Sequence, residues 1–162
     1  PGCGGEPGRG HRSRSGGVEG PVSTPVRRAL YGKLAGDTTL NTILGAPPAG
    51  YSKSIYHQQA PAGAGFLYVL FQKQAGNPTE AFGDPSAIDT DVWLVKAVDR
   101  NTSADPAEAA AARIIVLLND AALSISGSVL LYLRRQSDVE YPEEIDGVQY
   151  KHAGSLFRLV TD

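Results

Sequence analysis

The pattern of apolar and polar positions predicts two short helices near the start of the structured part of the chain. Apolar residues recur at helical spacing at Val26, Leu30 and Leu34. Thr24 is the expected N-cap, and the proline that follows it occupies the first helical position. The segment TTLNTILG then predicts a second short helix that ends at Gly45, because glycine commonly terminates a helix.

Extended stretches follow the two helices. Residues 54–58 predict a short strand, and residues 66–72 (FLYVLFQ) are apolar at both alternating sets of positions, which is typical of a strand buried on both faces. Residues 74–87 contain Asn-Pro and Gly-Asp-Pro and predict a long loop. Residues 89–100 alternate again, with Val and Leu on one side and Trp93 on the other, and predict a third strand.

The second half of the chain predicts one strong helix and two more strands. Residues 105–120 begin with Asp105, the expected N-cap, and carry an apolar stripe at helical spacing. Residues 127–139 and 147–162 predict strands, and the acidic residues 140–146 predict a loop between them. The order α-α-β-β-β-α-β-β lacks regular strand–helix alternation, so we expect an α+β fold, a mostly antiparallel β-sheet with helices packed on one face.

Composition divides the 162 residues into an extension and one domain. Residues 1–21 are rich in Gly, Pro and Arg and hold almost nothing apolar, so we expect them to be disordered. Residues 22–162 have the length of a single domain. The chain contains no methionine, and a start at Val22 would make residues 1–21 either upstream sequence or a dispensable arm.

Net charge, cysteine content and hydrophobicity limit the classes of partner and of binding site that the chain can have. The net charge is -2 and the pI is about 5.9, which argues against broad phosphate contacts with duplex nucleic acid. A single cysteine, Cys3, permits neither an intramolecular disulfide nor a cysteine metal site. No apolar stretch approaches the roughly 20 residues that span a bilayer, so no membrane partner is expected.

Candidate chemistry is sparse. His57 and His152 could be grouped with an acid such as Asp99, but a histidine in a strand is more often structural than a metal ligand when no regular ligand spacing accompanies it. The glycines do not form a phosphate-binding loop, and no serine lies in a nucleophile elbow. We therefore expect no catalytic, metal or cofactor-binding residues, and a protein that is not an enzyme.

The succession of segments resembles one known family. The segments VRRALYGKLAGDTTLNTILG, SIYHQQAPAGAGFLYVLFQ, VWLVKAVD, DPAEAAAARIIVLLND, GSVLLYLRRQ and DGVQYKHAGSLFRLVT occur in this order over residues 23–162. In order and spacing they resemble the tail-terminator, or tail-completion, proteins of long-tailed phages and gene transfer agents. The chain departs from that family at Leu67, where a proline is often found before the tyrosine.

The resemblance implies a structural virion protein. Such a protein is made in the bacterial cytoplasm and closes into a ring, typically a hexamer, at the tail–head junction of the virion. The ring caps the completed tail tube, stops its polymerisation and joins a head-side connector or stopper protein, while DNA passes through the lumen without sequence-specific binding. The alternatives are another head–tail connector component, such as a stopper or adaptor, or an unrelated small binding module.

Candidate contact residues come from the two predicted loops and one basic pair. Phe82 is the one aromatic residue in the first loop, and an exposed aromatic side chain can anchor a partner. Arg134 and Arg135 follow an apolar strand, where one can lie along the sheet edge while the other faces solvent or a partner. The full set of candidate interface residues is Phe82, Glu80, Asp84, Glu140, Glu143, Glu144, Asp146, Arg134 and Arg135.

Overall fold

The structure confirms the predicted order of helices and strands. The computed structural model describes residues 23–81, 84–100 and 103–162, and the side chains of residues 78–87 lie outside that description. The elements are α1 (Ser23–Ala35), α2 (Thr38–Leu44), β1 (Ile55–His57), β2 (Leu67–Ala81), β3 (Asp84–Asp99), α3 (Asp105–Leu118), β4 (Leu130–Ile145) and β5 (Val148–Thr161).

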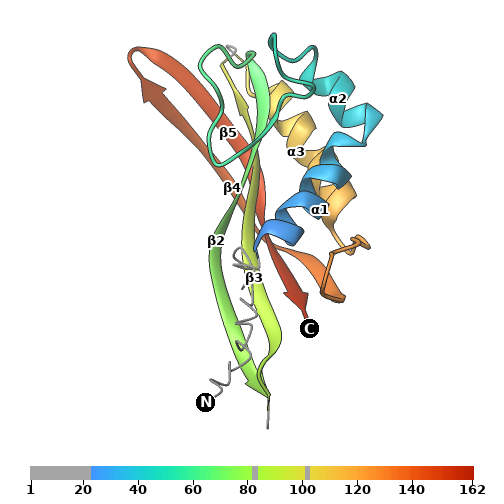
Figure 1. The fold of residues 1–162 in the computed structure, drawn as a ribbon. Coiled ribbons are helices and arrows are strands. Elements are labelled where there is room, and N and C mark those ends of the chain that lie inside the picture. The colour runs from blue at the N-terminus through green and yellow to red at the C-terminus, as the bar shows by residue number, and fades with distance from the viewer. Residues whose placement is uncertain (1–22, 82–83, 101–102) are drawn as a thin grey trace, which may run out of the picture.

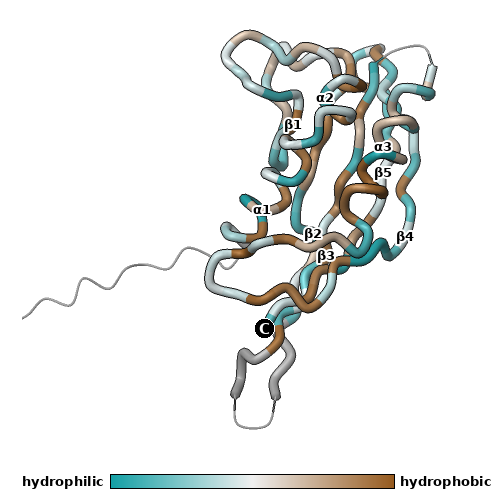
Figure 2. Tube along the Cα trace, turned by 90° about the vertical axis from the view of Figure 1, so that its right-hand side faces the viewer, coloured by the Kyte–Doolittle hydropathy of each residue, from teal (hydrophilic) through white to brown (hydrophobic). Residues whose placement is uncertain are grey.

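One five-stranded sheet carries all three helices on the same face (Figure 1). The strand order is β1-β2-β3-β5-β4, and every pair is antiparallel except β1 with β2. The two edges of the sheet are therefore formed by β1 and β4. In Figure 2, β1 and α1 lie on one side of the molecule, and β4 lies on the other. This is the α+β fold expected from the sequence.

The core lies between the helices and the central strands. The predicted stripe of α1 is confirmed, because Val26, Leu30 and Leu34 are all fully buried. They share one apolar cluster with Trp93 of β3, which is also fully buried. The helix-facing side chains of the central strands and the apolar stripe of α3 complete this cluster, so burial of apolar surface holds the helical layer to the sheet.

Two helix starts differ from the predictions, by two residues in α1 and by one in α3. Helix α1 begins at Ser23 rather than after Thr24. Helix α3 begins at Asp105 itself, and its N-cap is Ala104, whose side chain cannot accept a hydrogen bond. The hydroxyl of Ser103 instead accepts a hydrogen bond from the backbone N–H of Asp105 at 3.2 Å. Asp105 lies in the first turn, where its carboxylate interacts favourably with the positive end of the helix dipole.

The predicted loop over residues 74–87 is wrong. The described residues of this segment continue β2 and β3 as paired strands, with Asn77 opposite Thr90 and bulges on either side. Strand β5 pairs with β3 only from Asp89 onward, so the outer part of the segment is a two-stranded arm. The prolines that suggested a loop are tolerated because both strands have an open edge there: β1 pairs with β2 no farther than Phe71, and β5 does not pair with β3 before Asp89. Figure 1 shows the arm extending past the helical layer.

The predicted acidic loop over residues 140–146 is also wrong. Strand β4 continues to Ile145, and β5 begins at Val148. Asp146 and Gly147 form a two-residue connection with φ of 51° and 76°, the positive values that a tight hairpin turn of type I′ requires. The acidic residues therefore belong to a β-hairpin. We call residues 140–149 the hairpin tip.

Candidate functional site

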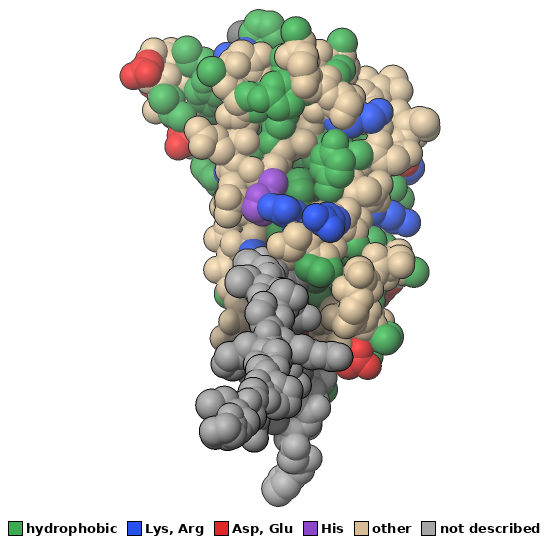
Figure 3. Space-filling view, in the orientation of Figure 1, with side chains coloured by type: hydrophobic (Ala, Val, Ile, Leu, Met, Phe, Trp, Pro, Cys, Tyr) green, Lys and Arg blue, Asp and Glu red, His purple; other side chains and the backbone are tan. Residues whose placement is uncertain are grey.

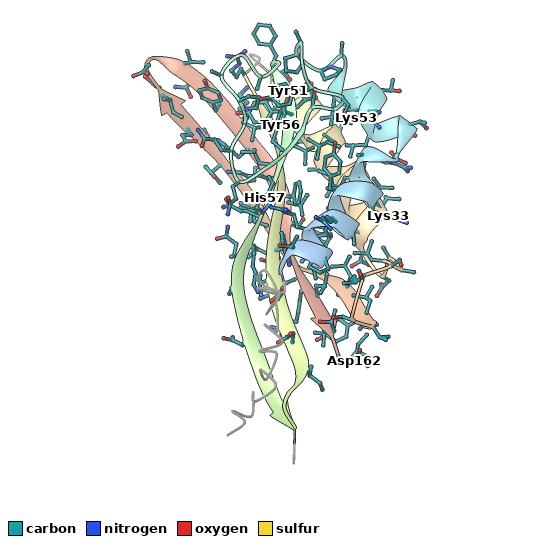
Figure 4. The ribbon with its side chains drawn as sticks, viewed as in Figure 1. Lys33, Tyr51, Lys53, Tyr56, His57 and Asp162 are labelled. Carbon is teal, nitrogen blue, oxygen red and sulfur yellow. The ribbon has the colours of Figure 1, made fainter. Side chains whose placement is uncertain are left out.

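A pocket opens at the β1 edge of the sheet, between α1 and the segment that follows β1. Its volume is about 630 Å³, and we call it the α1/β1 pocket. Aromatic side chains form much of its wall, among them Tyr31 of α1, Tyr56 of β1 and Phe71 of β2. In Figure 4, Tyr51 and Tyr56 lie close together above His57 on this side of the molecule. The rings of Tyr51 and Tyr56 meet edge to face, with centroids 5.5 Å apart.

Two arginines of α1 line the same pocket. Arg27 is half-buried and Arg28 is exposed. Neither side chain forms a hydrogen bond or an ion pair within the part of the chain that the structure describes. Figure 3 shows basic side chains beside a histidine, with hydrophobic side chains above them. The pocket therefore combines an aromatic wall with positive charges that lack an internal partner.

His57 lines this pocket, and its imidazole packs against two aromatic side chains. Its imidazole lies edge-on to Phe71, with centroids 5.3 Å apart, and tilted against Trp93 at 6.4 Å. Burial lowers the pKa of His57 below its ordinary value, and the positive charge of Arg27 lowers it further. A neutral imidazole packed against two aromatic rings fits the structural role expected from the sequence.

The hairpin tip carries four carboxylates, at Glu140, Glu143, Glu144 and Asp146, and no lysine or arginine. All four side chains are exposed. Figure 3 shows acidic side chains at the upper left, where Figure 1 places the end of the β4–β5 hairpin. Within the described structure, Glu140 and Asp146 have neither a hydrogen bond nor an ion pair through their side chains. The structure thus brings the four predicted acidic residues together on one projecting element.

His152 lies at the base of the hairpin tip in a small network. Its ring stacks on Tyr141 with centroids 4.5 Å apart, and its Nε2 atom lies 3.0 Å from Oε2 of Glu143. The Lys96 ammonium donates a hydrogen bond of 2.6 Å to the Tyr141 hydroxyl. Burial lowers the pKa of His152, nearby Lys96 lowers it further, and Glu143 acts in the opposite direction. This network links the hairpin to β3.

The basic pair on β4 is partly neutralised within the chain. Arg134 Nε donates to Asp120 at 2.9 Å, and Arg135 pairs with Asp138 across a bulge. Hydrogen bonds from Arg135 and then Ser155 lower the pKa of Asp138 below its ordinary value. Both arginines line a shallow cavity of about 430 Å³ on the β4 side, far along the strand from the acidic tip. The two predicted sets of charged residues on β4 are therefore separate features.

Three predicted contact residues cannot be placed. Phe82 lies outside the described residues, and the side chains of Glu80 and Asp84 do too, although the backbones of both belong to the arm. Sequence reasoning also missed Arg27 and Arg28. The signal was present, because α1 holds three basic residues and no acidic one. That bias was hidden by the apolar stripe that defined the helix.

Neither a metal centre nor a membrane span is found in the described part of the chain. Among those residues, no group of three or more His, Cys, Asp or Glu could hold a metal ion. His57 and His152 belong to different clusters, with the first at the β1 edge and the second on β5. None of the described helices has both the length and the apolar character needed to cross a bilayer.

Known proteins share this fold. No protein-family model matches the chain, and neither does any curated protein. A solved structure titled as the virion of a native gene transfer agent particle aligns with a TM-score of 0.67 and 18% identity, over 87% of this chain and 98% of that one. A second solved structure aligns with a TM-score of 0.54 and 20% identity, over 85% of this chain and 94% of that one. The chain therefore has the fold of a component of a gene transfer agent particle.

Proposed function

We propose that the protein is a structural component of a virion, and specifically a tail terminator. In this role it forms a ring on the completed tail tube, stops further polymerisation and offers the surface that joins a head-side connector. The observation that carries the proposal is the fold similarity to the gene transfer agent component, which extends over 98% of that chain. The same succession of elements underlies the family resemblance of the sequence.

Features of the described structure support an assembly role. A ring of identical subunits requires two different surfaces on each copy, because head-to-tail contacts repeat until the rotation closes. This chain has different surfaces at the two edges of its sheet, a basic aromatic pocket beside β1 and an acidic hairpin beyond β4. A weakly acidic protein also suits a lumen through which DNA slides without being held.

The experiment that tests this proposal uses the full chain and purified tail tubes of the particle that contains it. We expect electron microscopy with an antibody label to find the protein at one end of each tube. Tubes capped in this way should not lengthen when tube protein is added, whereas uncapped tubes should. Label along the tube wall, or continued growth of capped tubes, would contradict a terminator. Label restricted to isolated head particles would favour a stopper or adaptor instead.

A further inference from the structure

We propose that the hairpin tip of one copy docks in the α1/β1 pocket of a second copy of this chain. This inference rests on the proposed function, because it names the contact by which neighbouring subunits of the ring would meet. It identifies the partner of the pocket as residues 140–149 of the next subunit. The two surfaces match in charge, in apolar content and in position on the sheet.

Charge is the first match. Arg27 and Arg28 bring two positive charges to the pocket, without an ion pair inside the described chain. The hairpin tip contains four carboxylates and no lysine or arginine. Asp37, which follows α1 in the chain, is already paired with Arg113. Complementary potentials of this kind set the orientation of partners and accelerate their encounter.

Apolar surface is the second match. Ile145 and Val148 are directly opposite each other in the register, next to the turn. Their side chains are 47% and 42% exposed, so the end of the hairpin presents a pair of aliphatic groups between carboxylates. The pocket offers the complementary arrangement, with Tyr31 and Phe71 in its wall and the arginines beside them. A projecting apolar end that enters a concave aromatic site is the geometry of an interface anchor.

Position is the third match. The pocket lies at the β1 edge, and the hairpin is formed by β4 at the other edge together with β5. Figure 2 shows these two edges on opposite sides of the molecule. A copy that donates its hairpin to one neighbour therefore keeps its pocket free for another. Such a contact is heterologous, and its repetition gives a closed ring or an open filament.

A second copy accounts for both surfaces at once. Any other acidic partner would cover the pocket and leave the hairpin tip, with its aliphatic pair and the carboxylates of Glu140 and Asp146 that are unpaired within the described structure, exposed on the same chain. A single self-contact buries both the pocket and the tip in every subunit except those at the end of an open array. For this reason we assign the pocket to the hairpin of this chain rather than to an unrelated acidic peptide.

The test uses charge reversal on each side of the contact in the full chain. We expect R27E/R28E and E140K/E144K each to weaken self-association by at least about 30-fold in Kd, measured by analytical ultracentrifugation, because each opposes like charges. An equimolar mixture of the two variants should associate again. In that mixture the acidic pocket of one variant meets the basic hairpin of the other, and the two unmodified surfaces also meet.

Lys33→Glu is the matched control on the same helix. Lys33 also belongs to α1 but does not line the pocket, and Figure 4 places it away from His57. This variant changes the net charge in the same direction as one arginine reversal. We expect it to associate within about 3-fold of wild type, since exposed charges remote from a contact are screened by salt. Circular dichroism of each variant separates loss of association from loss of folding.

Cross-linking gives a second, independent readout. In a Cys3→Ser background, a chain with Ile145→Cys and a chain with Gln59→Cys should form a disulfide-linked pair under mild oxidation, because Gln59 lines the pocket. Placing the cysteine at Lys33 instead of Gln59 should give no such pair. Absence of the Ile145–Gln59 link in associated protein would overturn the proposed contact.

The outcomes distinguish this contact from the proposed function. Capping of tubes by R27E/R28E at the wild-type concentration would overturn the contact and leave the terminator function standing. Association through the pocket, with restoration in the mixture but no capping of tubes, would support the contact and contradict the terminator function. A mixture of the two variants that remains monomeric would overturn the contact.

Discussion

At the scale of single residues, Asp37 joins two helices, α2 and α3, through one carboxylate. It is the N-cap of α2 and accepts a hydrogen bond from the Leu40 N–H at 2.6 Å. It also accepts two hydrogen bonds from Arg113 of α3, at 3.0 and 2.6 Å. The bonds from Arg113, and then that from Leu40, hold the pKa of Asp37 below its ordinary value of 3.8, although burial acts in the opposite direction.

We expect Asp37→Ala to lower the free energy of unfolding by about 1–2 kcal/mol at pH 7, because the helix loses its cap. Asp37→Asn, which retains a capping oxygen, should lower it by less. Since the pKa is depressed in the folded state, the charged carboxylate stabilises the fold above pH 3.8, and this contribution is lost as the pH falls through the folded value. Urea unfolding at pH 7 and pH 3 should show the difference between wild type and Asp37→Asn shrinking in acid.

His152 should change stability with pH in the same direction as Asp37, but over a higher pH range. Burial and then Lys96 lower its pKa in the folded state, so the unfolded chain binds the proton more readily. Stability is therefore retained above the ordinary value of 6.5 and falls below it, by at most about 1.4 kcal/mol per pH unit. His152→Phe keeps a ring against Tyr141 and cannot titrate. Its unfolding free energy should vary less than that of wild type between pH 6.5 and pH 5. If both proteins lost the same unfolding free energy over this pH range, titration of His152 would not be the cause of the loss.

At the scale of elements, β3 and β5 lie so close together at Gly154 that a side chain has no room there. A Cβ atom at this position would collide with the carbonyl oxygen of Val95 and with the Cα atom of Lys96, and both atoms belong to the backbone of β3. We expect Gly154→Ala to destabilise the fold by about 3 kcal/mol, because neither strand can move without disturbing the core.

Gly32 provides the matched control. It lies within α1, and a Cβ atom there would have nothing within 4 Å. We expect Gly32→Ala to stabilise the protein by about 0.5–1 kcal/mol, because alanine loses less conformational entropy in a helix. Thermal unfolding of both variants measures the contrast, and a loss of stability in Gly32→Ala would show that α1 needs a glycine for another reason.

The elements that local sequence determines were predictable, and those that depend on pairing were not. Helices α1 and α3 follow from apolar spacing, which acts within a few turns. The sequence predicts a loop at the β2–β3 arm because Asn-Pro and Gly-Asp-Pro break central strands. The prediction fails because strands with an open edge tolerate these residues. The hairpin turn had a clear signal in Asp146-Gly147, and the surrounding acidic residues obscured it.

The candidate site was predictable on one side only. The four acidic residues of the hairpin tip are close in sequence, so their clustering required no knowledge of the fold. The α1/β1 pocket is assembled from α1, from the segment after β1 and from Phe71 of β2. These pieces become neighbours only when β1 pairs with β2 in parallel register, which no local pattern specifies.

At the scale of the whole molecule, acidic and basic side chains lie on different elements, a distribution that favours the proposed contact between copies. The hairpin tip is acidic and α1 is basic, although the net charge is only -2. We expect the Kd of self-association to rise with salt, by about 10-fold or more between 0.05 and 0.5 M NaCl, because exposed charges are screened over a shorter distance. Sedimentation velocity at several salt concentrations measures this. An affinity that is constant or rises with salt would indicate a purely apolar contact.

The two-residue turn of the β4–β5 hairpin makes the length of this element adjustable in fixed steps. Successive residues of a strand point to opposite faces and advance about 3.3 Å each. Inserting two residues into each strand before the turn would lengthen the projection by about 7 Å and leave Ile145 and Val148 on their original face. Inserting one residue into each strand would turn the aliphatic pair to the other face. Related chains should therefore differ in hairpin length by even numbers of residues per strand, and a designer who wishes to change the spacing of subunits in the proposed ring should do the same.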